Sequence, residues 1–150
     1  MKSSKPWVIL TVLAVTGMTT YFIILKKQQD NNLRAIRNSW TSWIFINNAH
    51  YTYTAFGSAE PLDIPIQNNS DYIIDEVIVA IRYGKSSGVT VKTENVTINN
   101  ILPHSIKTAH APATLQGVSV DTDITEVVSR GLQFCYPSGS GSVGDPYYCQ

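Results

Sequence analysis

The chain has 150 residues and no formal net charge, and only 15% of its residues are charged, against about a quarter in a typical soluble protein. From residue 38 onward, five basic residues stand against ten acidic ones, which gives a net charge of about −5. An acidic domain without a basic stripe lacks the electrostatic footprint of a nucleic-acid-binding protein, so this class is excluded. About 110 to 125 residues remain after an apolar N-terminal segment, which is enough for one domain with one core.

The apolar segment Trp7–Leu25 contains 19 residues without a charge, between Lys5 and the pair Lys26-Lys27. This is long enough for a helix to cross a hydrocarbon core of about 30 Å, where membrane lipid would surround it. A cleaved signal peptide is the alternative, but no A-x-A-like site follows the segment. The sequence predicts four parts: an N-terminal tail (1–6), a transmembrane helix (7–25), a juxtamembrane stalk (26–39) and a folded domain (40–150).

Charge and cysteines give opposite indications about orientation. Four basic residues follow the apolar segment and two precede it, which alone favours a cytoplasmic domain. Cys135 and Cys149 are the only cysteines, and the segment between them is rich in Gly, Ser and Pro. This pattern predicts a disulfide-closed loop, which would contribute about 3 kcal/mol and persist only in an oxidising compartment. We give the cysteines more weight and expect a periplasmic or extracellular domain.

Short runs with a period of two predict about seven strands at intervals of about ten residues, without room for a βαβ unit. The strongest run, Tyr72–Tyr83, should form a central strand. The run Leu62–Gln67 is expected at a sheet edge or in a bulge, because Pro65 cannot donate to a ladder. The sequence therefore predicts an all-β fold, an immunoglobulin/fibronectin-like β-sandwich of about seven strands behind a transmembrane helix. The other expected strands fall in 40–53, 89–101, 117–128 and 132–136, with a loop after His104 that holds Ala111 and Pro112.

Histidines and carboxylates give no sign of catalysis or metal binding. His50, His104 and His110 lie in turn or loop contexts without a nucleophile motif, and no standard zinc motif has the spacing of the last two. The acidic group 71–76 lacks the spacing of a calcium loop. Asp121 and Asp123 are interpreted as turn residues. We expect no enzyme activity, no metal and no cofactor.

Two aromatic groups are candidates for a contact surface. The larger group consists of Trp40, Trp43, Phe45, Tyr51, Tyr53 and Phe56. Packing in a core is the more common role of such a group. The smaller group is Tyr147-Tyr148, beside Cys149 at the end of the Gly-rich loop, where the composition is typical of a contact surface.

The stretch from Leu62 to Tyr136 resembles small exported bacterial domains of uncharacterised function. The residues that carry this resemblance are Asn68-Asn69-Ser70, the strand ending Ile81-Arg82-Tyr83, the segment Thr93–Pro103 and the run Gly117–Val120. More loosely, the stretch is similar to the FxLYD and late-embryogenesis-abundant type 2 sandwiches, although it has no F-x-L-Y-D string. The resemblance implies an immunoglobulin-like or fibronectin-like fold and an exported context, and it brings no catalytic residues.

Together these features predict a membrane-anchored, non-enzymatic module that binds a protein partner of the cell envelope through its loops or a sheet edge. A structural subunit of a membrane complex or a pilus-like filament is the first alternative, since type IV pilins also begin with an apolar helix. A cytosol-facing anchored domain with free thiols is the second.

Overall fold

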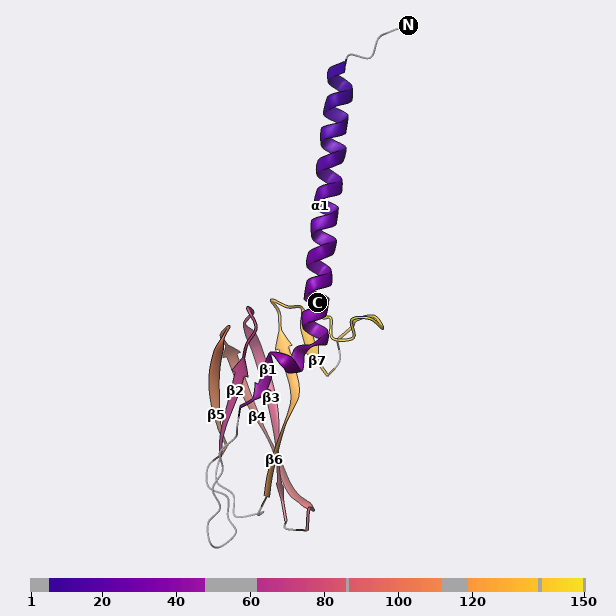
Figure 1. The fold of residues 1–150 in the computed structure, drawn as a ribbon. Coiled ribbons are helices and arrows are strands. Elements are labelled where there is room, and N and C mark those ends of the chain that lie inside the picture. The colour runs from indigo at the N-terminus through magenta and orange to yellow at the C-terminus, as the bar shows by residue number, and fades with distance from the viewer. Residues whose placement is uncertain (1–5, 48–61, 86, 112–118, 138, 150) are drawn as a thin grey trace. The chain divides into compact units, whose positions relative to one another are not determined.

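The computed structural model describes residues 6–47, 62–85, 87–111, 119–137 and 139–149, and for residues 6–15 it describes the backbone alone. Two compact units are present, Met1–Ile36 and Arg37–Gln150. The second unit begins at Arg37, three residues before the predicted domain boundary at residue 40. Each unit is considered by itself below (Figure 1).

The first unit consists of most of α1 (Pro6–Asn38), a helix of 33 residues and about 50 Å. Pro6 stands at its first position, where the missing N–H removes no intrahelical hydrogen bond. The helix is continuous over 7–25 and over the predicted stalk as far as Asn38. Among the residues that the structure describes, no helix is both long and apolar enough to cross a membrane.

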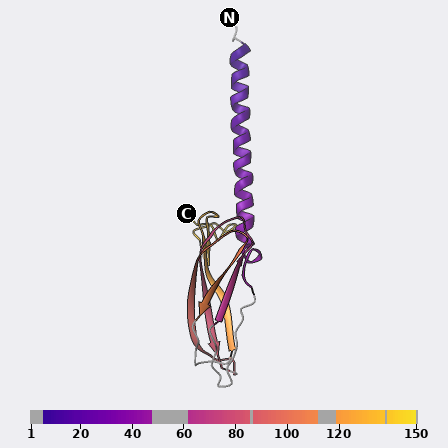
Figure 2. The same ribbon diagram turned by 90° about the vertical axis from the view of Figure 1, so that its left-hand side faces the viewer.

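The second unit is mostly β, in two antiparallel sheets that fit a β-sandwich of about seven strands (Figures 1 and 2). Sheet order is β1-β2-β5 in one layer and β4-β3-β6-β7 in the other. The strands are β1 (Ile44–Ile46), β2 (Leu62–Asn68), β3 (Ile74–Gly84), β4 (Thr90–Ile101), β5 (Ser105–Ala111), β6 (Ser119–Ser129) and β7 (Phe134–Tyr136). At this level the predicted fold class is confirmed.

The core lies between the sheets and is centred on β3. Val77, Val79, Ile81 and Tyr83 share one face of β3 and are at most 1% exposed. Ile64 and Ile66 of β2, in the other sheet, are fully buried as well. β3 lies between β4 and β6, so the predicted central position of Tyr72–Tyr83 is confirmed.

The predicted edge position of Leu62–Gln67 is wrong, because β2 is the middle strand of its sheet. The carbonyl of Pro65 accepts a hydrogen bond from the N–H of Asn47, just beyond the end of β1. The nitrogen and carbonyl of one strand residue point to the same side. The missing N–H of Pro65 therefore faces the place where β1 has already ended, and no ladder bond of β1 is lost.

Three other expectations need correction, two about strands and one about Asp121 and Asp123. The run from Trp40 begins as a 3₁₀ turn, η1 (Trp40–Ser42), and only Ile44–Ile46 of it forms a strand; Tyr51 and Tyr53 lie outside the described residues. The expected loop after His104 contains β5, whose buried side chains are the small Ala109 and Ala111.

Asp121 and Asp123 do not form a turn, since both lie inside β6. There they alternate with the inner-face residues Thr122 and Ile124 and pair with β3 at Arg82 and Ala80. Strand alternation explains this pattern better than turn chemistry, because every second position from Ser119 to Ile124 faces away from the core.

Candidate functional site: an open sheet edge

The edge of the four-stranded sheet is incomplete. β7 pairs with only the last residues of β6, Val127–Ser129. β7 ends at Tyr136 because the next residue, Pro137, has no N–H to continue the ladder. Within the described part of the chain, the preceding residues of β6, Ser119–Glu126, therefore have β3 on one side and no strand on the other. The pairing with β3 skips Thr125, where the register shifts. We call this stretch the open edge.

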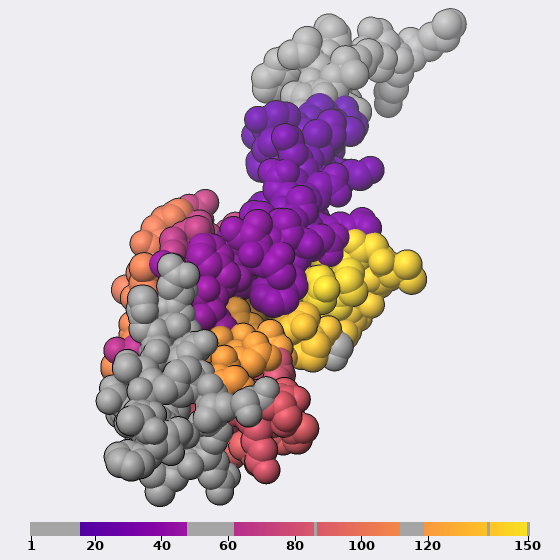
Figure 3. Space-filling view, turned by 60° about the horizontal axis from the view of Figure 1, so that its bottom comes forward, coloured from indigo at the N-terminus to yellow at the C-terminus, as the bar shows by residue number. Residues whose placement is uncertain are grey.

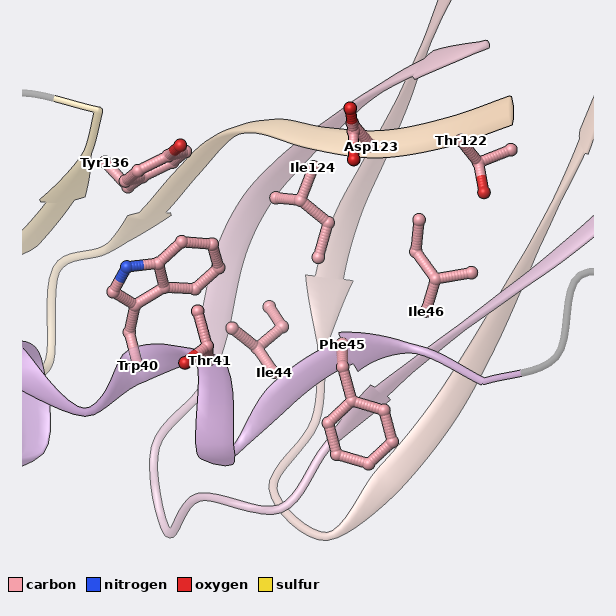
Figure 4. A pocket seen from close by; sticks show the side chains of 9 residues that line it. All are labelled: Trp40, Thr41, Ile44, Phe45, Ile46, Thr122, Asp123, Ile124 and Tyr136. Atoms are coloured by element: carbon pink, nitrogen blue, oxygen red, sulfur yellow. The ribbon is translucent and has the colours of Figure 1, made fainter.

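An apolar groove of about 410 Å³ runs beside the open edge, between β6 and β1 (Figure 4). Figure 4 shows Ile124 and Thr122 pointing from β6 toward Ile44 and Ile46 of β1, while Phe45 points away from β6. Ile46 and Ile124 are half-buried, although they occupy inner-face positions. We call this space the edge groove.

Two aromatic rings close one end of the edge groove. Trp40 of η1 and Tyr136 of β7 lie with their ring centroids 4.4 Å apart. Behind them, Trp43 packs against Phe134 at 5.5 Å. Trp40 and Trp43 are buried. These members of the larger aromatic group therefore pack in the core, which is the more common role of such residues. Tyr51, Tyr53 and Phe56 of the same group lie outside the described residues.

Negative charge lines the outer rim of the open edge. Arg82 of β3 donates two hydrogen bonds to Asp121, at 3.2 and 2.9 Å, and forms an ion pair with Asp123 as well. Hydrogen bonds to Asp123 and then to Asp121 raise the pKa of Arg82. Because one guanidinium faces two carboxylates, one negative charge remains uncompensated within this cluster. In Figure 3, the surface of this orange part of the chain is visible beside the purple segment that leads into β1.

The opposite side of the sandwich carries a polar contact between β5 and β4. There, Lys107 of β5 donates a hydrogen bond of 2.6 Å to the carbonyl of Asn99 on β4. Lysine at a sheet edge is a common protection against pairing with another chain. The two sides therefore differ in chemistry, since the edge groove is lined mainly by apolar side chains.

The disulfide loop runs along the free side of β7, and none of its described residues pairs with the open edge. Cys135 and Cys149 are bonded, as the sequence predicts. The N–H of Cys135 donates to the carbonyl of Tyr147, and the N–H of Cys149 donates to that of Gln133, so 147–149 run beside β7. A side chain at Gly139 would collide with the backbone of Tyr148, which explains a glycine at this close approach.

Tyr147 and Tyr148 both make internal contacts. Tyr147 packs on Phe134 and Tyr136, with ring centroids 5.8 and 6.0 Å apart. The ring of Tyr148 lies 5.2 Å below the guanidinium of Arg37. Both tyrosines are half-buried, and their role as a contact surface stays a prediction.

Arg37 is the most deeply buried charged side chain among the described residues, with 4% of its surface exposed. It forms an ion pair with Asp145 of the disulfide loop, to which its Nε donates at 3.0 Å. Its Nη1 donates to the carbonyl of Leu132 at 2.8 Å. Asn38 adds a hydrogen bond of 3.2 Å to the carbonyl of Gly144. The loop is therefore fastened both to β7 and to the first residues of the second unit.

The remaining sequence candidates have partners elsewhere. His104 contacts Asp71 at 2.7 Å and His110 contacts Asp63 at 2.5 Å, both at exposed positions. Asp75 accepts a hydrogen bond from the backbone N–H of Arg130. No group of three or more His, Cys, Asp or Glu side chains in the described ranges could hold a metal ion. His50 lies outside those ranges.

Tyr83 should show a pH-dependent contribution to stability. Burial, with the nearby Glu94 carboxylate, raises the pKa of Tyr83 to about 12. The folded protein therefore favours the neutral phenol, whose stabilising contribution is complete below the ordinary pKa of about 10 and is lost as the pH rises to about 12. We expect Tyr83→Phe to flatten the fall in unfolding free energy over this interval, measured by urea denaturation.

Glu94→Gln is the matched control for this prediction. It removes the neighbouring negative charge and keeps the buried phenol, so the Tyr83 ionisation should move to lower pH in an ultraviolet titration of tyrosinate. An unchanged alkaline transition in both variants would contradict the assignment.

No family model, curated protein or solved structure matches this chain. The resemblance to FxLYD and late-embryogenesis-abundant type 2 sandwiches therefore stays a prediction.

The edge groove could not be predicted from the sequence alone. The signals that bear on it are the alternation Val120-Asp121-Thr122-Asp123-Ile124 and the position of Pro137 after a short apolar run. Neither signal shows which strand would neighbour β6, so the open edge becomes visible only in the strand order.

Proposed function

We propose that this chain is a non-enzymatic protein-binding module that holds an extended segment of a partner along the open edge of β6, above the edge groove. The observation that carries the proposal is the shortness of β7, which leaves Ser119–Glu126 without a strand partner on the groove side in the described structure. Addition of a strand to an exposed sheet edge is a recurrent mode of peptide recognition.

The geometry supports this mode in two ways. No described strand pairs with the groove side of the open edge, so its backbone groups there would supply main-chain hydrogen bonds, which give such complexes their affinity. Alternate side chains of the added strand would point into the edge groove, toward Ile46 and Ile124, and apolar side chains there would provide specificity. The aromatic pair Trp40 and Tyr136 would bound the site at one end.

We also propose an immunoglobulin/fibronectin-like fold. In a constant-type immunoglobulin domain, strands A, B, E and D form one sheet and strands C, F and G form the other. Here the first, second and fifth strands share a sheet, and the third, sixth and seventh share the other. The difference is β4, which pairs with β3 instead of β5.

We propose in addition that α1 anchors the module in a membrane, with the domain outside the cytoplasm. The 19 uncharged residues from Trp7 to Leu25 support the anchor. So do the hydroxyls of Thr19 and Thr20, which donate to the carbonyl of Thr16 at 3.0 and 2.5 Å and so need no water. The Cys135–Cys149 disulfide supports an oxidising compartment.

Thiol labelling in intact cells tests the location. An impermeant maleimide should react with the two cysteines only after reduction. Labelling that requires lysis and no reductant would place the domain in the cytosol.

Selection of random peptides against the 150-residue chain, kept oxidised in mild detergent, tests the binding function. We expect enriched peptides to bind the wild type and to lose binding to Ile124→Lys, which places a charge in the edge groove. Ile106→Lys, on the outer face of β5 where Ile106 is 54% exposed, is the matched control and should bind like the wild type. Equal binding to both variants would contradict the site, and turnover of a substrate in a broad hydrolase screen would contradict the non-enzymatic assignment.

A further inference from the structure

We propose that the occupant of the open edge is a strand of another protein in which apolar residues alternate with Lys or Arg. This inference rests on the proposed function and specifies the chemistry of the partner. It follows from the two faces of β6, which differ in character along Ser119–Ile124, before the register shift at Thr125.

The inward positions of the occupant must be apolar. Strand residues alternate between the two faces of a sheet, so a strand paired with β6 would continue both of its faces. On the inner face, it would lie beside Thr122 and Ile124 and over Ile44 and Ile46 of β1 (Figure 4). An unpaired polar or charged group would lose its hydration in this groove and find few partners.

The outward positions of the occupant should be basic. On the outer face of β6, Asp121 and Asp123 lie beside Arg82 on the β3 side, while their other side faces the open edge. A Lys or Arg on an added strand would take the position opposite Arg82 and balance the second carboxylate. Opposite charges on neighbouring strands stabilise a sheet, and like charges destabilise it.

The same charges argue against a second copy of this chain as the occupant. If two copies of β6 paired antiparallel around Thr122, Asp121 of each copy would stand opposite Asp123 of the other. Four carboxylates would then meet two Arg82 guanidinium groups on one sheet face. Like-charged residues at an edge prevent pairing between identical strands. The open edge therefore favours a strand in which apolar residues alternate with Lys or Arg.

Defined peptides test this inference with the oxidised 150-residue chain in mild detergent. The probe is a labelled peptide of about eight residues in which Lys and Ile alternate. A second peptide carries Glu in place of Lys, and a third has the composition of the first with its isoleucines in one block. We expect fluorescence polarisation to show the tightest binding for the alternating Lys peptide, weaker binding for the other two, and a loss of affinity with added salt.

Protein variants that each lack one carboxylate form the second part of this test. Asp121→Asn and Asp123→Asn, both at exposed positions, should each weaken the alternating Lys peptide by about two- to fivefold and reduce its advantage over the Glu peptide. Asp71→Asn, an exposed carboxylate outside β6, is the matched control and should leave affinity unchanged. Circular dichroism of each variant checks that the fold is kept.

Three results would overturn the inference. The first is equal affinity for the alternating Lys peptide and the Glu peptide. The second is equal affinity for the alternating Lys peptide and the peptide with its isoleucines in one block. The third is dimerisation of the chain that Asp121→Asn strengthens, because a second copy would then be the occupant. If randomly selected peptides still bind the wild type and fail to bind Ile124→Lys, the proposed function stands and the partner chemistry alone is wrong.

Discussion

Arg37→Ala should destabilise the second unit by about 3–5 kcal/mol, the usual cost of removing one member of a buried ion pair. The side chains of Arg37 and Asp145 are 5% and 13% exposed. The substitution would leave the Asp145 carboxylate poorly hydrated, remove the hydrogen bond to Leu132 and end the contact with the Tyr148 ring. Urea denaturation followed by tryptophan fluorescence measures the effect, since Trp40 and Trp43 are buried nearby.

Arg82→Ala is the matched control, because it removes an arginine whose carboxylate partners are 69% and 60% exposed. Exposed ion pairs contribute little, so its effect should be much smaller than that of Arg37→Ala. The double variant Arg37→Ala/Asp145→Ala should lose less than the sum of the two single losses, because no unpaired charge remains. A loss for Arg37→Ala as small as that for Arg82→Ala would contradict the structural role of the buried pair.

Replacement of both Cys135 and Cys149 by serine should lower the unfolding free energy by about 3 kcal/mol. The two cysteines are 14 residues apart, and a cross-link over such a loop restricts the unfolded chain by about this amount. The substitution also frees the loop that brings Asp145 to Arg37. Denaturation of the oxidised wild type and of the serine variant under the same conditions measures the difference.

A double-mutant cycle connects these two predictions. In the serine background, Arg37→Ala should cost less than in the wild type, because the loop no longer holds Asp145 in place. Glu94→Gln, which lies on β4 and away from the loop, is the control and should cost the same in both backgrounds. If the losses of unfolding free energy from Arg37→Ala and from removal of the disulfide are additive, the loop keeps its structure without the bridge.

Alternation in the sequence predicted those strands that bury large side chains on one face. β3 is the clearest case, because Val77, Val79 and Ile81 fall on one face and become fully buried. β5 was missed because its buried positions are Ala109 and Ala111, which do not stand out as apolar in the sequence. Pro65 was misleading because its effect depends on where β1 ends, which is a property of the pairing and not of β2 itself.

The disulfide could be predicted because two cysteines in one Gly-rich segment leave few alternatives. The partner of Arg37 could not, since Asp145 lies 108 residues away in the sequence and reaches it only through the folded loop. The open edge was hidden for a similar reason. Asp121 and Asp123 look like turn residues until β6 is placed between β3 and the short β7.

Amide hydrogen exchange of β6 in the peptide complex tests the central claim most directly. With the alternating Lys peptide or a selected peptide bound, every second amide in Ser119–Ile124, before the register shift at Thr125, should exchange more slowly, because a strand pairs with the side that β3 leaves open. Amides of β5, at the opposite side of the sandwich, should be unchanged. Bound peptide that slows exchange in β5, or leaves Ser119–Ile124 unchanged, would contradict strand addition at this edge.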